Sequence, residues 1–574
     1  MFKDQTAIVR IGQTEFSKNI DSTELNLACK AINHLMPQKP FLRYIVSMRF
    51  LNFFILLLIT SSCAKNEFDL LILNGTIIDG SGDPGYQSDL AIKDDRIVKI
   101  GNLSSYDAKI IINAVNLIVA PGFIDSHTHA IRGIFDVPTA ESSLLQGVTT
   151  LTDGNDGTSP YPINDHYAEI EALKISPNWA VFVGQGTVRE EVMGLDDRNP
   201  TGEELDQMKI MISDAMEDGA LGISTGLFYV PGSFSSTKEV IELSKVAAGY
   251  GGIYISHMRE EAADILKSIN ETINIGIEAS IPVQITHHKI IGKANWGLAT
   301  NTLKLVDEAI KRGVNVSIDQ YPYTASQTSI RALIPQWAQA GGRKELLKRI
   351  NDPKTRQLLI DGIIERILFD RGGGHPKNVF ISKSAWDTSM EGKNLADLCI
   401  ERDLEPTPRN AAMVVFEIIK GGGASAVYHA INSDDVDLIM RHPMTSIASD
   451  GPLTFFNEGS PHPRTYGTFA RVLGTYVRDR NIITLEEAIR KMTSLPANML
   501  SIDRRGLIKE GYFADITIFD KNVIADKATF EDPHQYAVGV NSVIVNGTIV
   551  VENGVHNGNR PGKVLRGPGY KRNK

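Results

Sequence analysis

Two patterns of hydrophobic and polar residues divide the chain from residue 64 onward. Short strand-like segments punctuated by Asn-Gly and Asp-Gly pairs lie near both ends, as in LILNGTIIDG at 71–80 and VIVNGTIVVENG at 543–554. Such pairs between alternating apolar residues favour tight hairpins. The similarity of the two segments predicts one small β-domain built from residues 64–121 and 500–574.

The central region, residues 122–499, repeats an apolar strand, a polar strand end and a helical segment. Ser224, His257, His287 and Asp319 stand at strand ends 33, 30 and 32 residues apart. Repeats of this length indicate βα units and a parallel sheet. An open doubly wound sheet is the alternative, but reactive residues at successive strand ends are typical of a TIM barrel. The predicted fold class is therefore α/β, a metal-dependent TIM (β/α)8 barrel with an insertion at about 331–384, beside a small discontinuous β-sandwich domain formed by both chain ends.

The first 63 residues show a different pattern. An apolar run of 11 residues from Phe50 to Thr60 is followed by Ser-Ser-Cys. The run is too short to span a membrane and is typical of a signal-peptide core. Residues 48–63 resemble a bacterial lipoprotein signal, which predicts export, a lipid anchor at Cys63 and a periplasmic, membrane-attached protein if translation starts at Met48, and a cytoplasmic one otherwise. Residues 1–47 resemble the opening of a thiolase-like fold that nothing later continues, and we interpret them as a stray extension.

Composition narrows the class of partner. The chain has 574 residues, 42% hydrophobic and 22% charged, with a net charge of -9. These values are typical of a soluble globular enzyme, and the negative charge gives no general attraction for nucleic acid. We therefore expect a small-molecule substrate and no nucleic-acid partner.

Four histidines suggest a metal site. His127 and His129 lie on one face of a strand, about 7 Å apart along the chain, and His257 and His287 follow two other apolar strands. Each alone is compatible with a hydrogen-bonded loop residue. On one barrel mouth, however, the four imidazoles would converge as they do around Zn²⁺ or a similar divalent ion.

Two further residues extend this hypothesis. Asp450, in SIASDGPL, is either a turn residue or a proton-transfer group, because a carboxylate beside a metal can accept a proton from water and pass it to the leaving amine. His288 should point away from His287, whereas Lys289 should share the face of His287.

Ordered stretches such as PGFIDSHTHA, GISTGLFYVPG, SHMRE, DQYPYTA and PHPRTYGTFARVLG carry a family resemblance. From about residue 66 to 566 the chain resembles the N-acyl-D-amino-acid deacylase (D-aminoacylase) family of the amidohydrolase superfamily. The resemblance implies an outer metal held by His127, His129 and Asp450, and an inner one held by His257 and His287. It also implies that Lys289, Tyr323 and Arg464 line the substrate pocket, with Arg464 as a bidentate clamp for the α-carboxylate.

The sequence departs from the family at two positions. Asp156 stands in a GNDG turn where the family usually has the cysteine of GNCG, and Gln185 stands where a histidine is expected. Aspartate can bridge two ions but is a harder ligand than thiolate, which weakens the preference for zinc. We expect Zn²⁺, as one or two divalent ions, with Mn²⁺ or Fe²⁺ as alternatives.

These observations predict a metal-dependent hydrolase that cleaves the linear amide of N-acyl-D-amino acids, or of dipeptides that contain a D-amino acid. A cyclic amidase of the hydantoinase or dihydroorotase kind is an alternative, although such enzymes usually bridge their metals with a carboxylated lysine. A surface lipoprotein that binds a ligand without turnover is another. The sequence does not define the oligomeric state.

Overall fold

The computed structural model describes residues 68–570. The predicted extension at 1–47, the signal segment at 48–63 and the lipid-attachment residue Cys63 lie outside the described residues. Among residues 68–570, no helix combines the length and the apolar character needed to cross a membrane.

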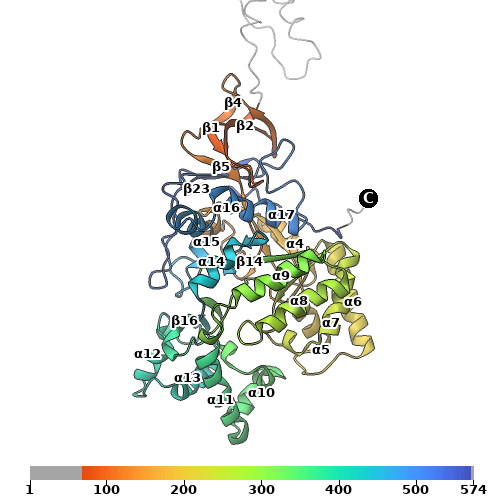
Figure 1. The fold of residues 1–574 in the computed structure, drawn as a ribbon, viewed down its shortest axis with the longest axis vertical. Helices are drawn as coiled ribbons and strands as arrows, with labels where there is room; N and C mark the ends of the chain where they lie inside the picture. The colour runs from red at the N-terminus through yellow and green to blue at the C-terminus, as the bar shows by residue number, and fades with distance from the viewer. Residues whose placement is uncertain (1–67, 571–574) are drawn as a thin grey trace, which may run out of the picture. The chain divides into compact units, whose positions relative to one another are not determined.

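Both ends of the described chain contribute strands to one β-domain, as predicted (Figure 1). β5 from the first segment pairs antiparallel with β20 from the second, with Pro121 opposite Ile516. The strands form one hydrogen-bonded sheet, and Ile97 N donates to Tyr512 O at 3.0 Å so that β3 meets the chain just before β20. The predicted sandwich is thus one continuous sheet, and strands from both chain segments contribute to one apolar cluster. The strands are β1 (Phe68–Ile77), β2 (Tyr86–Lys93), β3 (Arg96–Gly101), β4 (Ala108–Asn113), β5 (Ile118–Pro121), β20 (Ile516–Phe519), β21 (Val540–Val545), β22 (Thr548–Glu552) and β23 (Val555–His556).

The central region is a parallel barrel, which confirms the predicted fold class. One sheet has six strands and another has three, and β9 continues into β10 after Phe182, so together they supply eight barrel strands. The ring closes just beyond the strands, where β7 (Thr128–His129) pairs with β19 (Gly451–Pro452) and Asp450 N donates to His127 O at 2.8 Å. The barrel strands are β6 (Phe123–Asp125), β8 (Val148–Asp153), β9 (Asn178–Val181), β10 (Val183–Gly184), β11 (Gly222–Gly226), β12 (Ile253–His257), β13 (Val283–Ile285), β14 (Val316–Gln320) and β18 (Thr445–Ile447).

Helices cover the barrel because each has one apolar face. α9 buries Leu303, Val306 and Ala309, three residues apart, against the strands. α6 begins at a capping box in which Thr201 and Glu204 bond each other's backbone amides. The covering helices are α3 (Glu141–Leu144), α4 (Ile163–Leu173), α5 (Gln185–Met193), α6 (Gly202–Asp218), α7 (Thr237–Gly249), α8 (Ile265–Ala279), α9 (Ala299–Lys311), α14 (Ser433–Arg441), α15 (Arg464–Arg471), α16 (Leu485–Met492) and α17 (Ser494–Met499).

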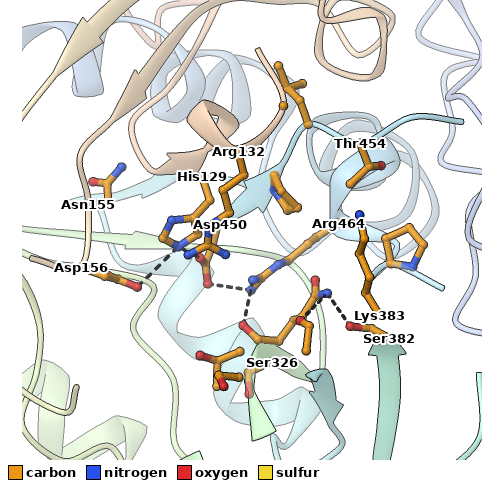
Figure 2. Close-up of a pocket in the computed structure, with 18 of the residues that line it drawn as sticks. His129, Arg132, Asn155, Asp156, Ser326, Ser382, Lys383, Asp450, Thr454 and Arg464 are labelled. Atoms are coloured by element: carbon orange, nitrogen blue, oxygen red, sulfur yellow. Dashed lines mark hydrogen bonds and ion pairs between the residues drawn. The ribbon is translucent and has the colours of Figure 1, made fainter. Parts of the chain in front are cut away.

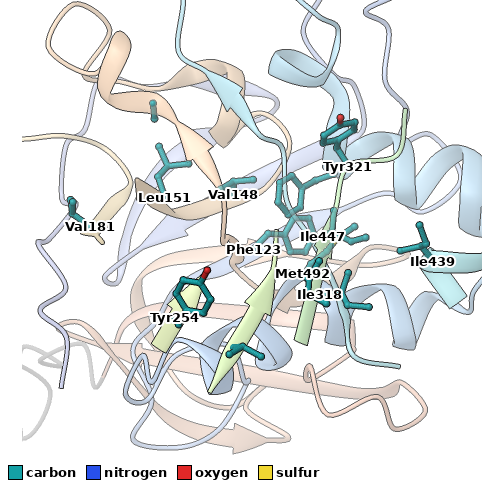
Figure 3. Close-up of a cluster of buried hydrophobic side chains, with 14 of the residues drawn as sticks. Phe123, Val148, Leu151, Val181, Tyr254, Ile318, Tyr321, Ile439, Ile447 and Met492 are labelled. Atoms are coloured by element: carbon teal, nitrogen blue, oxygen red, sulfur yellow. The ribbon is translucent and has the colours of Figure 1, made fainter. Parts of the chain in front are cut away.

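The main hydrophobic cluster lies between strands and covering helices (Figure 3). Strand residues such as Leu151 and Ile447 meet Met492 of α16 there. Phe123 stacks on Phe469 with ring centroids 5.9 Å apart. Burial of this size holds the strand ends, and the residues that follow them, in fixed positions.

An inserted lobe follows β14 and carries its own apolar core. Its sheet joins β15 (Ser326–Ser329), β17 (Ser425–Tyr428) and β16 (Val379–Lys383) in that order. The lobe therefore ends at Tyr428 and not near residue 384 as the sequence suggested, because β17 pairs with both other strands. Its helices are α10 (Gly342–Asn351), α11 (Pro353–Phe369), α12 (Leu395–Ile400) and α13 (Pro408–Gly421).

The end of the described chain also differs from the expected domain division. Trp179 N donates to Lys563 O at 3.0 Å, and Leu565 N donates to Trp179 O at 2.7 Å. Gly567 N then donates to Gly219 O at 2.8 Å. The residues after Pro561 therefore run along the barrel, because the exposed edge beside β9 offers them backbone partners.

Candidate metal centre

Six of the predicted residues converge at the carboxyl ends of the barrel strands. One group, the outer cluster, contains His127, His129, Asp156 and Asp450. The other, the inner cluster, contains Asp156, His257 and His287. Within each, one ligand atom per residue lies within 4.8 Å of every other. The structure thus places all six predicted metal ligands together.

Asp156 stands between the two clusters. Its Oδ1 lies 3.5 Å from His127 Nε2 and 3.4 Å from His287 Nε2. Its Oδ2 lies 3.5 Å from His129 Nε2 and 3.5 Å from His257 Nδ1. Each carboxylate oxygen therefore faces one histidine of each cluster, so Asp156 would be shared by ions held at either cluster.

The backbone is strained at three of these residues. Asp156, His287 and Asp450 have φ values of 55°, 35° and 51°, in the left-handed region that L-residues seldom adopt. Such strain concentrates at functional sites where the surrounding structure holds it. For His287 the support is Asp319, whose Oδ1 accepts the His287 backbone N–H at 2.6 Å.

The turn that carries Asp156 is fixed by β11. Ser224 Oγ donates to Gly154 O at 2.5 Å and accepts the Gly157 N–H at 3.2 Å. Both glycines have positive φ, at 79° and 76°, and a Cβ on Gly154 would lie 2.3 Å from Phe182 O. Ser224, predicted at a strand end, therefore positions Asp156 and does not line the pocket.

The residues present fit a metal ion. Both ring nitrogens of His127, both of His257 and Oδ1 of Asp156 are buried without a hydrogen-bond partner among the described residues. Buried polar atoms without partners are costly, and ions at the clusters would satisfy Asp156 Oδ1 and the ring nitrogen of each histidine that faces it, His127 Nε2 and His257 Nδ1. Imidazole and carboxylate together suit Zn²⁺, Mn²⁺ and Fe²⁺.

The electrostatics of the centre also favour a cation. Burial opposes ionisation of Asp156, but the surrounding histidines, His287 foremost, hold its pKa well below the usual range. Burial and Lys289 oppose protonation of His287, yet Asp156 and Glu261 raise its pKa to about 10. Burial, together with the nearby His287, lowers the pKa of His257 to about 4 against the opposing effect of Glu261 and Asp156. Carboxylates that favour a protonated imidazole here favour a metal cation for the same reason.

Glu261 orients the inner histidines. Its carboxylate lies 3.6 Å from His257 Nε2 and 3.3 Å from His287 Nδ1. The opposite ring nitrogens of these histidines are the ones that face Asp156. Glu261 also accepts from Lys289 Nζ and, at 3.2 Å, from Arg371 Nη2. A carboxylate behind a ligand histidine fixes its tautomer and orientation, so Glu261 belongs to the site although the sequence analysis missed it.

Asp450 is held from the other side. Burial disfavours its charge, but Arg464 and the histidines outweigh burial and hold the pKa of Asp450 below its usual range. Arg464 Nη1 donates to Asp450 Oδ2 at 2.6 Å, while Asp450 Oδ1 lies 3.1 Å from His129 Nε2. The free oxygen therefore points at the outer cluster.

Both clusters open into a cavity of about 650 Å³, whose wall includes Lys289. Asp450 and Arg464 also line this cavity (Figure 2). Lys289 Nζ lies 2.9 Å from His287 Nδ1, so the two share a face as predicted. His288 points away, with Nε2 2.9 Å from Thr302 Oγ1. A cavity of this size accommodates a small-molecule ligand.

One expected position was wrong. Tyr323 is not in the cavity wall: its hydroxyl donates to Pro463 O at 3.4 Å and its ring lies below Arg471. The expectation came from the family resemblance. In this chain the backbone turns after β14, where Tyr323 N donates to Tyr321 O, and the side chain lies against Pro463 and Arg471. Gln185 also lies outside the wall, with Nε2 donating to Ser235 and Glu239.

Arg371 is a second residue of the site that the sequence analysis missed. It follows α11 in the lobe and lines the cavity from there. The only local signal is its position before three glycines. Glu261 had a clearer signal, because it is an acid four residues after a strand-end histidine.

This fold and site define a metal-dependent hydrolase. The Amidohydrolase family model matches residues 111–551. The D-aminoacylase of Alcaligenes xylosoxydans xylosoxydans is 36% identical over 528 residues, which cover 88% of this chain and 99% of that protein. The chain therefore belongs to the N-acyl-D-amino-acid deacylase family of amidohydrolases.

Solved structures agree with this assignment. An N-acyl-D-glutamate deacylase from Bordetella bronchiseptica, complexed with zinc and a phosphonate inhibitor, is 32% identical with a TM-score of 0.74, over 87% of this chain and 99% of that one. A D-aminoacylase described as having a binuclear metal centre is 34% identical with a TM-score of 0.75, over 87% of this chain and 100% of that one.

Proposed function

We propose that this protein hydrolyses the amide bond of N-acyl-D-amino acids, with dipeptides that contain a D-amino acid as related substrates. The observation that carries the proposal is the position of Asp450. It belongs to the outer cluster, lines the cavity and directs the oxygen that Arg464 does not hold at that cluster, 3.1 Å from His129 Nε2. A ligand-binding protein without turnover has no need of such a carboxylate.

The roles of the residues follow from their positions. His127, His129, Asp156 and Asp450 would hold one ion, and His257 and His287, with Asp156, a second. A bound divalent ion supplies Lewis-acid activation of water and of the amide carbonyl. Asp450 Oδ1 accepts the proton of the attacking water and delivers it to the leaving nitrogen. Arg464 keeps Asp450 ionised and in place for the first of these transfers.

Lys289 and Arg464 provide the positive charge for the substrate α-carboxylate. Both line the cavity, and Arg464 Nε is buried without a partner among the described residues. Arg464 Nη1 holds Asp450 and Nη2 donates to Gln327 O at 3.2 Å, so its remaining donors for substrate are Nε and the second hydrogens of the two terminal nitrogens. A guanidinium suits this double task because its donors are fixed in one plane.

Zn²⁺ is the proposed ion, with Mn²⁺ and Fe²⁺ as alternatives because Asp156 is a harder ligand than the cysteine of the family. Two ions would fit the clusters with Asp156 as a ligand shared between them. Metal analysis of the purified protein gives the identity of the bound ions. Activity measured while ions are added stepwise to chelated protein gives the number of ions that turnover needs.

The test of the function is amine release from matched N-acetyl-D- and N-acetyl-L-amino acids, with and without a chelator. D-selective release that the chelator abolishes supports the proposal. Hydrolysis of hydantoins or dihydropyrimidines in place of linear amides would assign the protein to the cyclic amidases. Metal binding without hydrolysis of either class would favour the binding-protein alternative.

Export and lipid attachment at Cys63 stay predictions from the sequence. Mass spectrometry of the protein from native membranes tests them. A mature chain that begins with diacylated Cys63 supports a membrane-anchored enzyme, and a mature chain that retains Met1 contradicts it.

A further inference from the structure

The walls of the cavity differ in chemistry. Nine lining residues belong to the inserted lobe, and eight of them carry a hydroxyl, an amide or a positive charge; none is acidic. We call this surface the lobe wall. The loops of the barrel supply the apolar side chains Val137, Pro452, Leu453, Phe455 and Pro461, which we call the apolar wall, together with the charged Arg132, Asp136 and Glu458. A substrate that spans the cavity therefore meets hydrogen-bonding groups on the lobe side and, on the other side, apolar side chains bordered by charges.

The polar groups of the lobe wall are held in place by the lobe sheet. Gln327 of β15 donates from Nε2 to Ser382 Oγ of β16 at 2.9 Å, and Ser425 Oγ of β17 lies 3.4 Å from the same nitrogen. Gln327 Oε1 is buried without a partner among the described residues. One residue from each strand thus contributes to a preformed polar surface.

Arg371 adds a charged donor to this wall. Its side chain is 2% exposed, and its guanidinium lies 4.0 Å from the ring centroid of Phe228. Its one side-chain acceptor among the described residues is Glu261, at 3.2 Å, and Nε has none. Glu261, Asp370 and Glu260 balance its charge, so what Arg371 still offers a ligand is hydrogen-bond donors.

Lys383 is the second cation of the lobe wall. It pairs with Glu458 at 2.9 Å, but the two side chains are 50% and 47% exposed. Exposed pairs of this kind are weak, so a substrate group can compete for the ammonium. Both cations and the hydroxyls of the lobe wall are therefore able to donate to the same kind of acceptor, a carbonyl or carboxylate oxygen.

We propose that the lobe wall is the side-chain subsite and selects D-amino acids whose side chain ends in a carboxylate or a carboxamide, while the acyl chain lies on the apolar wall. The inference rests on the proposed function and names its substrate class. A hydrocarbon side chain on the lobe wall would remove water from these polar groups without replacing its hydrogen bonds. Sites built to bond a polar substrate group discriminate strongly against analogues that lack it.

The first experiment compares kcat/KM for the N-acetyl derivatives of D-glutamate, D-glutamine, D-leucine and D-phenylalanine, with the zinc-loaded full chain. We expect D-glutamate or D-glutamine to exceed D-leucine by about 100-fold or more. A higher kcat/KM for the D-glutamate derivative than for the D-glutamine derivative assigns recognition of the side-chain end to Arg371 and Lys383. An equal or higher value for the D-glutamine derivative assigns it to the neutral donors of the lobe wall, and both results support the subsite. Equal or better turnover of D-leucine overturns it and leaves the proposed function intact, whereas no turnover of all four overturns both.

Matched variants locate the selection in the lobe wall. Gln327→Leu and Ser382→Ala should lower the glutamate-to-leucine ratio of kcat/KM by about tenfold or more, the size of one or two lost hydrogen bonds. Ser384→Ala is the control, because Ser384 is buried just past the end of β16 but does not line the cavity. A general structural defect would lower kcat/KM for both substrates alike and leave their ratio unchanged. An unchanged ratio in both test variants therefore contradicts the proposal.

Discussion

Arg464 Nη1 donates to Asp450 Oδ2 at 2.6 Å, and the two residues are 2% and 5% exposed. In a buried pair, removal of one partner leaves the other charge uncompensated. The pair therefore fixes both the orientation and the ionisation of Asp450. It also links the candidate proton-transfer group to the candidate carboxylate-binding group, so changes at either should affect both steps.

Asp450→Asn keeps the shape of the side chain but removes the proton acceptor. We expect kcat to fall about 10²- to 10⁴-fold, the usual contribution of a general base. Metal content should stay largely intact, because four histidines and Asp156 remain. Steady-state kinetics with metal analysis on the same sample checks both, and substantial activity in this variant would exclude Asp450 from proton transfer.

Asp156→Ala should lower the metal-to-protein ratio, because the residue stands between both clusters. Asp156→Cys should keep metal and shift the preference from manganese toward zinc, since thiolate is the softer ligand. Competition between the two ions, followed by metal analysis, measures this shift. Asp136→Ala is the control, because Asp136 lines the cavity outside both clusters; equal metal content in Asp156→Ala and this control would show that Asp156 is not a ligand.

Glu261→Gln should weaken metal binding about 10- to 100-fold, as loss of a carboxylate behind a ligand histidine does. Excess metal should restore kcat, because the ligands themselves remain. Glu260→Gln is the matched control, since the hydrogen bonds that the Glu260 carboxylate accepts within residues 68–570 come from the backbone of Glu261 and Ala262. Titration of chelated protein with zinc gives both affinities, and equal values would make Glu261 a residue of structural importance only.

His166 predicts a pH dependence of stability. Burial lowers its pKa to about 4, and its Nε2 accepts the indole N–H of Trp179 at 3.1 Å. The unfolded chain, with a histidine pKa of about 6.5, binds this proton as the pH falls below that value, while the folded protein does not. The free energy of unfolding contributed by His166 should therefore fall between about pH 6.5 and pH 4 and stay constant above it.

Urea unfolding near pH 7 and near pH 5 measures this effect. His166→Gln keeps a hydrogen-bond acceptor but does not titrate, so the variant should lose less stability than the natural protein on going to the lower pH. The same loss in both proteins would assign the pH dependence to other groups.

Residues that lie at or directly after the end of a strand were predictable from the sequence. His127, His129, His257 and His287 lie within two residues of a strand end, where parallel strands bring side chains to one edge of the barrel. The domain order followed from hairpin signals for the same local reason. These features depend on short-range periodicity, which a single sequence displays.

Residues placed by loops and by the lobe were not predictable. Arg371 reaches the cavity only because the lobe folds over the barrel mouth, and the four residues of β15, SQTS, carry no apolar alternation that would mark a strand. Tyr323 was misplaced because the backbone turns directly after β14. Such positions depend on tertiary packing, which periodicity does not encode.

The pairing of β5 with β20 has a consequence for synthesis. Pro121 and Ile516 face each other although they are 395 positions apart. Ribosomes add about 5 to 20 residues per second, so β5 emerges roughly 20 to 80 s before its partner exists. During that interval the edge of β5 is open to other strands. The barrel has time to form first, and the β-domain is completed last, when β20 pairs with β5.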